Sequence, residues 1–352
     1  MPSTLAIILV SLGAVAAKDI YVSPTGTGTG TLAAPYGSIQ SAVNAAVAGD
    51  TIYLRGGTYR PSANIQFSKS GTRTSPSSVR PYQSEKVIID GENMPGTPKA
   101  VGESLPNSER GIFHIQNANY WAFYKLELIN GPYGIYARDA SHNYYDGLST
   151  HDNYETGFQL EGASSNNTVA NLDSYRNRDP ARTARAPTAS PAKKAPARAT
   201  SCATPASGTT ATATASSSAS PITPANHVVR NCIAFQNYKK GFIDNGNPGA
   251  LAMERNTAWK NGDTGYVMRS SSSTLKNNIG SNNVNGQATL VSTVKASGNS
   301  WNLGVTWTDS LFKSTDSSTL KGARGSDGRV VPSDFLVPAS GQAIGATTRQ
   351  KL

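Results

Sequence analysis

Two adjacent lysines, Lys239 and Lys240, lie directly before Gly241 and Phe242 and offer the clearest chemistry in the chain. A neighbouring positive charge lowers the pKa of an amine, and a partly neutral lysine can act as a general base. The pair is therefore a place in the chain where proton transfer is chemically possible. The same pattern also fits the alternative of two solvated lysines at a turn.

The four histidines are His114, His142, His151 and His227. None of them has the spacing of metal ligands or a convincing nucleophile partner in the sequence. We therefore expect all four to lie in surface turns, outside any catalytic site.

The lysine pair belongs to a repeated pattern of Asn, three residues, Gly and a bulky apolar residue. The four copies are Asn130/Gly134/Ile135, Asn153/Gly157/Phe158, Asn237/Gly241/Phe242 and Asn261/Gly265/Tyr266. Within each pair of copies the spacing is 23 or 24 residues, which is too short for a domain and matches one coil of a solenoid. Between Gly157 and Gly241 the gap widens to 84 residues.

A second repeated element consists of a small residue, an aromatic residue, any residue and then Asn, at 174–177, 234–237 and 258–261. Stacked coils bring equivalent residues within about 4.8 Å of one another. At that spacing Asn side chains form ladders and aromatic side chains stack, and we expect both inside the coils. Residues 112–115 and 122–128 alternate as half-buried strands do. The sequence therefore predicts an all-β fold, a single-stranded right-handed parallel β-helix.

The amino-terminal region contains a targeting segment and a short capping helix. Residues 1–17 combine an apolar run with small residues up to Ala17, the pattern of a secretory signal peptide, and are too short to span a bilayer comfortably. We expect cleavage after Ala17 and one secreted β-helix domain over 18–352. Residues 38–47 have apolar positions at helical spacing, with Ser38 as the N-cap. Such a helix covers the exposed end of stacked sheets.

The composition fits a strand-and-turn protein that meets an acidic polymer. The chain of 352 residues has 33 Gly, which tolerate the left-handed turns at strand corners. Its formal net charge is +10, and it has no nucleic-acid motif, which favours an acidic polysaccharide as partner. Five of the basic residues lie within 181–225, so charge alone is a weak argument. Cys202 and Cys232 either pair in an oxidising compartment or remain free thiols.

Over most of its mature length the chain resembles the family 9 polysaccharide lyases, which are pectate lyases built on a parallel β-helix. The motifs that carry the resemblance are Gly49 to Tyr59, residues 174–180, Asn237-Tyr-Lys-Lys-Gly-Phe242, Asn245-Gly-Asn247, residues 256–259 and residues 325–336. The first of these is shared by many β-helix proteins. The motif around the two lysines is the most specific.

The resemblance implies anti-β-elimination on polygalacturonate or pectin, in which a base removes the C5 proton of a galacturonate and the bond to O4 breaks. The lysine before Gly-Phe is the base in the family, so this role transfers to Lys240. Lys239, Asn237 and Asn245 are expected to bind the substrate. Calcium neutralises the carbanion charge in the family, so Ca²⁺ is the expected cofactor. The expected product is a secreted monomer with no nucleic-acid or membrane partner.

Residues 181–225 depart from the family where its calcium site belongs. The segment contains no Asp or Glu, whereas calcium needs about six to eight oxygen ligands, mostly from carboxylates. The family places its calcium aspartates in the coils just before the catalytic lysine, so the metal ligands of this chain are unknown. One interpretation is a flexible low-complexity insert. The other is a coding stretch read in the wrong frame, because shifted codons permit Asp-Gly-Phe motifs with Gly-Phe pairs near 189 and 215.

Two other functions stay open at this point. A non-catalytic β-helix would bind polysaccharide along its groove through the coil surface and its positive charge. A uronan C5-epimerase would share the proton abstraction and then return a proton to the opposite face. The activity of this chain itself is also open, because the sequence lacks a visible calcium site.

Overall fold

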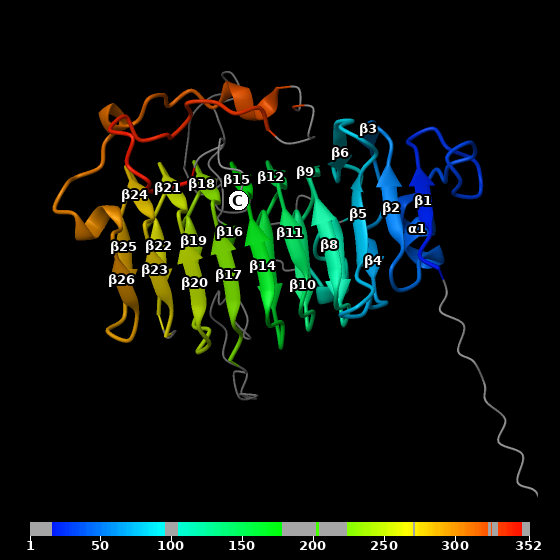
Figure 1. The fold of residues 1–352 in the computed structure, drawn as a ribbon, viewed down its shortest axis with the longest axis horizontal. Helices are drawn as coiled ribbons and strands as arrows, with labels where there is room; N and C mark the ends of the chain where they lie inside the picture. The colour runs from blue at the N-terminus through cyan, green and yellow to red at the C-terminus, as the bar shows by residue number, and fades with distance from the viewer. Residues whose placement is uncertain are drawn as a thin grey trace, which may run out of the picture.

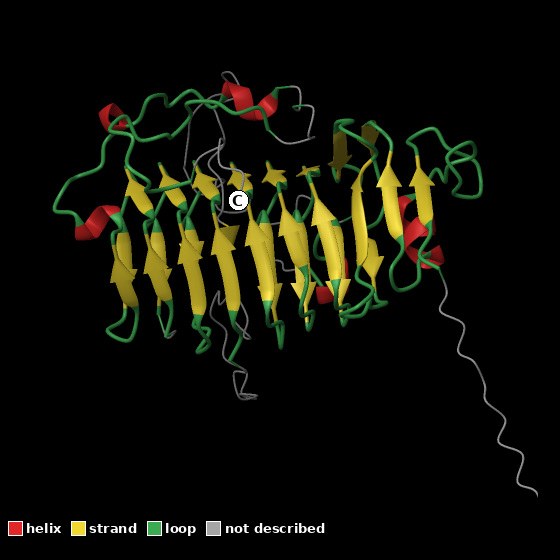
Figure 2. Cartoon of the chain, viewed as in Figure 1, coloured by secondary structure: helices red, strands yellow, loops and turns green. Residues whose placement is uncertain are grey.

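The computed structural model describes residues 16–95, 105–177, 202–203, 224–269, 272–322, 325 and 330–346. Their strands wind into stacked coils, which form three long sheets, named A, B and C here (Figures 1 and 2). Neighbouring strands are parallel in all three sheets. The predicted all-β parallel β-helix is therefore confirmed.

Sheet A contains, in spatial order, β1 (Asp19–Val22), β2 (Thr51–Leu54), β5 (Ser77–Pro81), β8 (Trp121–Tyr124), β11 (Tyr144–Asp146), β14 (Asn167–Ala170), β17 (His227–Arg230), β20 (Leu251–Glu254), β23 (Thr274–Lys276) and β26 (Lys295–Ser297). Sheet B contains β3 (Gly57–Tyr59), β6 (Val87–Asp90), β9 (Glu127–Ile129), β12 (Ser149–His151), β15 (Asp173–Tyr175), β18 (Ile233–Phe235), β21 (Thr257–Trp259) and β24 (Ile279–Ser281). Sheet C contains β4 (Ile65–Phe67), β7 (Phe113–Gln116), β10 (Ile135–Arg138), β13 (Phe158–Glu161), β16 (Cys202–Ala203), β19 (Phe242–Ile243), β22 (Tyr266–Met268) and β25 (Ala288–Leu290). The helices are α1 (Ile39–Ala45) and the 3₁₀ turns η1 (Asn107–Glu109), η2 (Ser300–Asn302), η3 (Asp309–Leu311) and η4 (Ser318–Lys321).

The interior of the coils is a continuous apolar core. Alternate residues of each strand point inward, and the parallel register places them in rows along the stack. The row from sheet A consists of Ile20, Ile52, Val79, Phe123, Tyr145, Val169, Val229, Met253 and Leu275, none of them more than 4% exposed. The bulky apolar positions of the predicted repeat, Ile135, Phe158, Phe242 and Tyr266, form a matching buried row in sheet C. The repeat therefore marks one coil each time it occurs.

Two ladders of buried asparagines fix the corners of the coils. The ladder between sheets B and C consists of Asn153, Asn177, Asn237, Asn261 and Asn283. The ladder between sheets A and B consists of Asn256, Asn278 and Asn299. Most of the side-chain carbonyls accept a backbone N–H from the coil before, as Asn261 Oδ1 does from Asn237 N at 3.1 Å, whereas Asn237 Oδ1 accepts from the side-chain amide of Asn177 at 3.4 Å. The predicted ladders are confirmed, except that Asn130 is outside them and donates to Asp90 Oδ1 at 3.0 Å.

The aromatic residues of the second repeat lie outside the coils, so the expectation that they stack inside is wrong. Tyr175, Phe235 and Trp259 project from the outer face of sheet B and form a second apolar cluster with the carboxy-terminal segment. Tyr175 and Phe235 stack with ring centroids 4.6 Å apart, and Phe335 packs on Phe235 at 5.1 Å. Figure 1 shows this orange and red segment running back along the sheet after β26. The carboxy-terminal segment covers these side chains, so the outer face of sheet B forms a second apolar core. Strand periodicity alone does not reveal such a cover.

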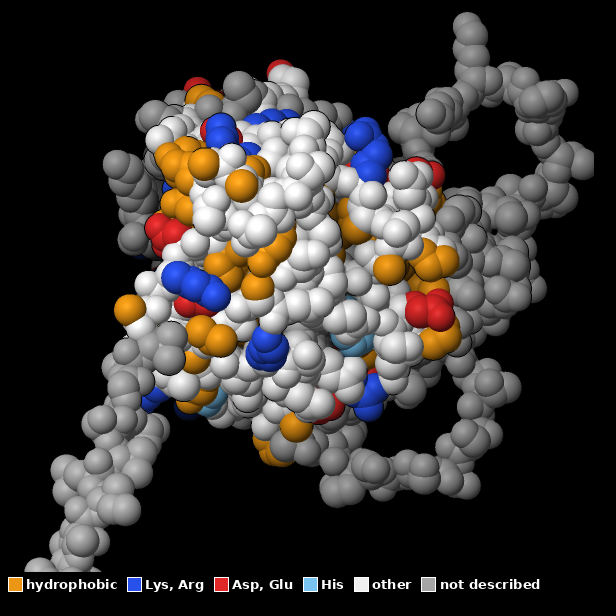
Figure 3. Space-filling model, turned by 90° about the vertical axis from the view of Figure 1, so that its right-hand side faces the viewer, with side chains coloured by type: hydrophobic (Ala, Val, Ile, Leu, Met, Phe, Trp, Pro, Cys, Tyr) orange, Lys and Arg blue, Asp and Glu red, His pale blue; other side chains and the backbone are white. Residues whose placement is uncertain are grey.

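Helix α1 closes the amino-terminal end of the stack, as predicted. The Ser38 side chain caps it by accepting a hydrogen bond from Ser41 N at 3.3 Å. Its buried residues, Ile39, Ala42 and Val43, belong to the main core. Figure 3 looks at this end of the molecule, where apolar side chains form separate patches between polar surface. The predicted signal peptide, 1–17, lies outside the described residues except for Ala16 and Ala17.

The strands before and after the low-complexity segment belong to consecutive coils. Strand β15 pairs directly with β18, and β14 pairs directly with β17. In sheet C, β16 lies between β13 and β19, with Cys202 opposite Phe158 on one side and Phe242 on the other. The shifted-frame interpretation places two Gly-Phe pairs, and hence two coils, in this gap, whereas the described residues form one sheet-C strand there. Apart from 202–203 and 224–225, residues 181–225 lie outside the described part of the chain.

Candidate active site

Lys240 lies at the corner where the chain passes from β18 in sheet B to β19 in sheet C (Figure 1). Its Nζ forms an ion pair with the carboxylate of Asp263. The side chains of Lys240 and Asp263 are 21% and 23% exposed. The amine therefore lies at the outer surface of the corner rather than in the core, as a base that acts on a polysaccharide requires.

Asp263 belongs to the next coil, and its backbone N–H donates to the carbonyl of Lys239 at 3.0 Å. Its carboxylate also accepts hydrogen bonds from Asn285 Nδ2 at 2.9 Å and from Thr264 N at 2.7 Å. Burial raises the pKa of this carboxyl, but the hydrogen bonds from Lys240, Asn285 and Thr264 outweigh burial and hold the pKa at about 2. Asp263 is therefore ionised at neutral pH and holds the amine of Lys240 in an ion pair.

Asn237 does not face the substrate side of the corner, so its predicted role in substrate binding is corrected. Its side chain is 2% exposed, and its Nδ2 donates to Ser174 O at 3.1 Å and to Asn261 Oδ1 at 3.0 Å. These bonds belong to the ladder and leave no contact surface for a sugar. Lys239 is partly exposed beside Lys240 and remains a candidate for substrate binding.

Asn245 lies at the other end of β19 from Lys240, so the structure does not bring the two together. Its backbone is left-handed, with φ of 51°, and its side chain is half-buried. The turn that follows is held by Asn247, which donates to Ala225 O at 2.7 Å and accepts from Ala225 N at 3.0 Å. The motif Asn245-Gly-Asn247 therefore closes the end of the low-complexity segment, and Asn245 remains a candidate for a contact remote from the base.

Three of the four histidines lie in strands, which corrects their assignment to surface turns. His114 in β7, His151 in β12 and His227 in β17 are each at most 6% exposed. Only His142 lies in an exposed turn-like segment, with φ of 60°. Burial lowers the pKa of His227 to about 4, against smaller opposing hydrogen bonds, so this imidazole is neutral at neutral pH. The assignment failed because these strands bury polar side chains on both faces: His227 shares the inward face of β17 with Val229, whereas His114 and His151 lie on outward faces.

Cys232 is a free thiol in the main core. Burial raises the pKa of this thiol to about 12, which makes it unreactive as a nucleophile. The side chain of Cys202 lies outside the described residues.

The residues around Lys240 do not fit a calcium site. Calcium takes about six to eight oxygen ligands, several of them carboxylates. The carboxylate of Asp263 already binds Lys240, and that of Asp244 accepts backbone N–H groups from Gly246 at 3.1 Å and Arg269 at 2.8 Å. Within the described part of the chain, no group of three or more His, Cys, Asp or Glu side chains could hold a metal ion.

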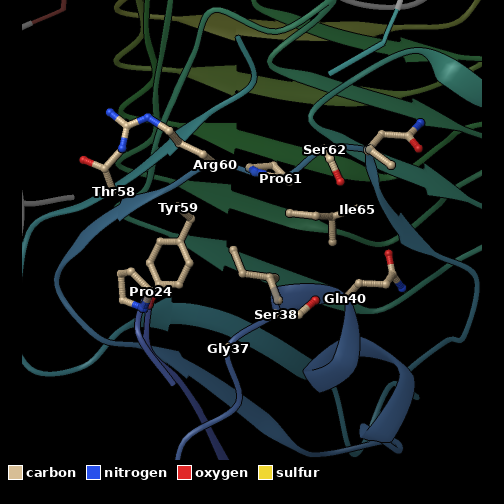
Figure 4. A pocket seen from close by; sticks show the side chains of 13 residues that line it. Pro24, Gly37, Ser38, Gln40, Thr58, Tyr59, Arg60, Pro61, Ser62 and Ile65 are labelled. Atoms are coloured by element: carbon tan, nitrogen blue, oxygen red, sulfur yellow. The ribbon is translucent and has the colours of Figure 1, made fainter. Parts of the chain in front are cut away.

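A separate pocket of about 510 Å³ lies at the amino-terminal end, between α1 and the loop before β4 (Figure 4). Its polar lining is already engaged, since Gln40 Oε1 accepts from Gln66 N at 2.7 Å and Ser38 caps α1. Arg60 at its rim forms an ion pair with Asp90 at 3.5 Å. This pocket lies several coils from Lys240 and carries no catalytic constellation.

Comparison with known proteins agrees with this architecture. Residues 20–190 match a family model described as "Pel9A-like, right handed beta helix region". Pectate lyase PEL9 of Emericella nidulans is 43% identical over 95% of this chain and 96% of that protein. Pectate lyase L of Paenibacillus polymyxa is 28% identical over 94% and 83%. The solved structure of pectate lyase Pel9A has the same fold, with a TM-score of 0.59 at 20% identity over 94% and 91% of the two chains.

The alignment with PEL9 also shows a difference in length. It spans 392 positions, and 95% of this chain is about 334 residues, so about 58 positions have no counterpart here. One coil takes 22 to 24 residues, so this difference is a little more than two coils. The match to the family model ends at residue 190, inside the low-complexity segment. By sequence and by fold, the chain belongs to the family 9 polysaccharide lyases, the pectate lyases with a right-handed parallel β-helix.

Proposed function

We propose that Lys240 is the base of a β-elimination on polygalacturonate. The observation that carries the proposal is the outward amine at the corner between sheets B and C, in a chain 43% identical to a pectate lyase over almost its whole length. The amine takes the proton from C5 of a galacturonate. The electron pair of the broken C5–H bond then forms the C4–C5 double bond as the bond from C4 to O4 breaks. The leaving O4 gains a proton, so that one chain becomes two and one new end is unsaturated.

Lys240 must be neutral to accept that proton, whereas in the structure its amine is engaged in an ion pair with Asp263. The reaction therefore requires Lys240 to leave the ion pair with Asp263 when the substrate binds. Lys239, on the same corner, adds a positive charge that favours the neutral amine and attracts the uronate carboxylates.

Ca²⁺ is the cofactor that the family resemblance implies, and it would neutralise the charge that develops next to the uronate carboxylate. The donor groups near Lys240 do not fit this ion, and the chain is about 58 positions shorter than PEL9 in their alignment. We therefore propose that the coils of the calcium pocket are missing from this chain, and that its activity is weak relative to PEL9.

The substrate class proposed for this chain is polygalacturonate or pectin, since the similar proteins are named pectate lyases. We also propose secretion through residues 1–17 and action as a monomer. No helix in the described part of the chain has the length and hydropathy of a membrane span.

The test is the ultraviolet absorbance of the unsaturated product, followed with polygalacturonate in the presence and in the absence of calcium. The expected result is a slow signal that Lys240→Ala abolishes and that Lys260→Ala, a lysine of the next coil, leaves unchanged. A signal unaffected by Lys240→Ala contradicts the assignment of the base. Binding without any signal favours the non-catalytic alternative, and altered sugars without chain cleavage favour the epimerase.

A further inference from the structure

A row of tyrosine and arginine side chains lies on the outer face of sheet A, near the amino-terminal end. The register of β1, β2, β5 and β8 places one of these side chains on each strand. The tyrosine–arginine row consists of Tyr21, Tyr53, Arg80 and Tyr124. Since the inward residues beside them build the core, these four side chains point away from it.

The side chains of the row contact one another in two pairs. The rings of Tyr21 and Tyr53 stack with centroids 5.4 Å apart and 17° between their planes. The guanidinium of Arg80 lies 4.3 Å from the centre of the Tyr124 ring. All four side chains are partly exposed, and in Figure 1 this face of sheet A is turned to the viewer with no other described element across β1 to β8. The row is an open surface.

Arg80 supplies the positive charge of this surface. Among the described residues no carboxylate forms an ion pair with Arg80, whose guanidinium lies against the Tyr124 ring and whose Nε is buried without a hydrogen-bond partner. The nearby Arg55, in contrast, pairs with Glu85 at 3.0 Å. A guanidinium donates two parallel hydrogen bonds to a carboxylate, so Arg80 is suited to an anionic ligand.

We infer that the tyrosine–arginine row is an accessory binding surface for an anionic polysaccharide. Aromatic rings present flat apolar surface on which the apolar faces of sugar rings pack. Neighbouring strands are about 4.8 Å apart, so the row extends over about 15 Å and contacts several consecutive sugars. The guanidinium of Arg80 favours a polyanion over a neutral glycan.

This surface is distinct from the candidate base. Lys240 lies at the corner between sheets B and C, whereas the row lies on sheet A several coils away along the stack. The row would hold the polymer while another stretch of it reaches Lys240. The identity of the polymer as a galacturonan rests on the proposed function. The recognition of a polyanion rests on the tyrosine–arginine row itself.

The test is affinity electrophoresis of the full chain in native gels that contain polygalacturonate. Replacing the row with Tyr53→Ala, Arg80→Ala and Tyr124→Ala together is expected to weaken retardation on the order of tenfold in apparent dissociation constant. Lys276→Ala, which removes a charge from sheet A beyond the row, is the matched control and is expected to leave retardation unchanged. Tyr53→Phe keeps the ring and is expected to bind like the native chain.

Equal retardation of the triple variant and the native chain, with circular dichroism showing both folded, would overturn the inference. Equal retardation in gels containing a neutral glycan would also overturn it, because Arg80 would then play no part. If the triple variant does not fold, Arg80→Ala alone gives the test, with a weaker loss expected. The variant Lys240→Ala is expected to bind normally, so failure of the catalytic assignment leaves this result intact.

Discussion

The side-chain amide of Asn177 approaches the side-chain carbonyl of Asn237 at 3.4 Å, although 60 residues of chain separate the two. In the rest of this ladder the spacing is 22 to 24 residues. The ladder therefore continues across the low-complexity segment as if one coil followed the other directly. The corner that carries Lys240 therefore belongs to the same ladder as the coils before the segment.

The ladder position of Asn237 predicts a stability effect. The variant Asn237→Ala leaves buried partners such as Ser174 O unsatisfied, and we expect it to lower the free energy of unfolding by about 1–3 kcal/mol. Urea denaturation followed by circular dichroism measures this. The control is Asn130→Gly, outside the ladder and at a φ of 56° that glycine adopts freely, which should cost less. A stable Asn237→Ala protein with impaired polysaccharide binding would instead restore the substrate-binding role.

The ion pair between Lys240 and Asp263 predicts a change in the titration of the carboxyl. The hydrogen bond from Lys240 helps to hold the pKa of Asp263 at about 2, so the variant Lys240→Met should raise the pKa of this carboxyl toward its usual range. An NMR titration of labelled aspartate side chains reads this pKa without requiring activity. The control is Lys260→Met, which removes the amine that pairs with Asp309 at 2.7 Å. If the pKa of Asp263 is the same in Lys240→Met as in the native chain, Lys240 does not control this carboxyl.

The buried imidazole of His227 predicts a loss of stability in mild acid. Its pKa is about 4 in the folded chain and about 6.5 when unfolded, so the unfolded state binds more protons between these values. Its contribution is complete above pH 6.5 and decreases by about 3 kcal/mol as the pH falls to 4. Denaturation midpoints measured across this range should change less in His227→Gln than in the native chain. Parallel curves for the two proteins would exclude His227 as the cause.

The low-complexity segment predicts a property of its gene. If residues 181–225 are read in a shifted frame, the shifted codons will encode aspartate motifs of the kind Asp-Gly-Phe. The nucleotide sequence decides this directly. A chain with the frame restored should bind calcium measurably by calorimetry. The present chain should bind it at least about tenfold more weakly, because the binding free energy of a lost pair of carboxylate ligands exceeds the roughly 1.4 kcal/mol that a tenfold change in affinity represents. Codons without those motifs leave the insert interpretation.

Much of the fold could be predicted from the sequence because the same residue pattern recurs in each coil of a solenoid. The structure confirms three local patterns: the 24-residue spacing of Asn237 and Asn261, the apolar residue after each Gly, and the N-cap Ser38. Asp263 was missed although it lies 24 residues after Lys239, at the equivalent place in the next coil. Projecting the coil spacing from the lysine pair would have found it.

Other features could not be predicted, because they depend on segments distant in sequence. Tyr175 and Phe235 alternate like core residues, and nothing local shows that Phe335 covers them from outside. The same reason explains His151, which is buried on an outer strand position. The direction of a side chain follows from strand periodicity, whereas its burial depends on what lies over it.

The unbroken ladder across the low-complexity segment has a consequence for how such a gene decays. Each coil offers its neighbour the same hydrogen-bonding surface, so losing whole turns removes chemistry while sparing the scaffold. A β-helix can therefore lose whole turns, with any site they carry, and still stack the turns that remain. Selection on carbohydrate binding alone would then be enough to preserve the fold.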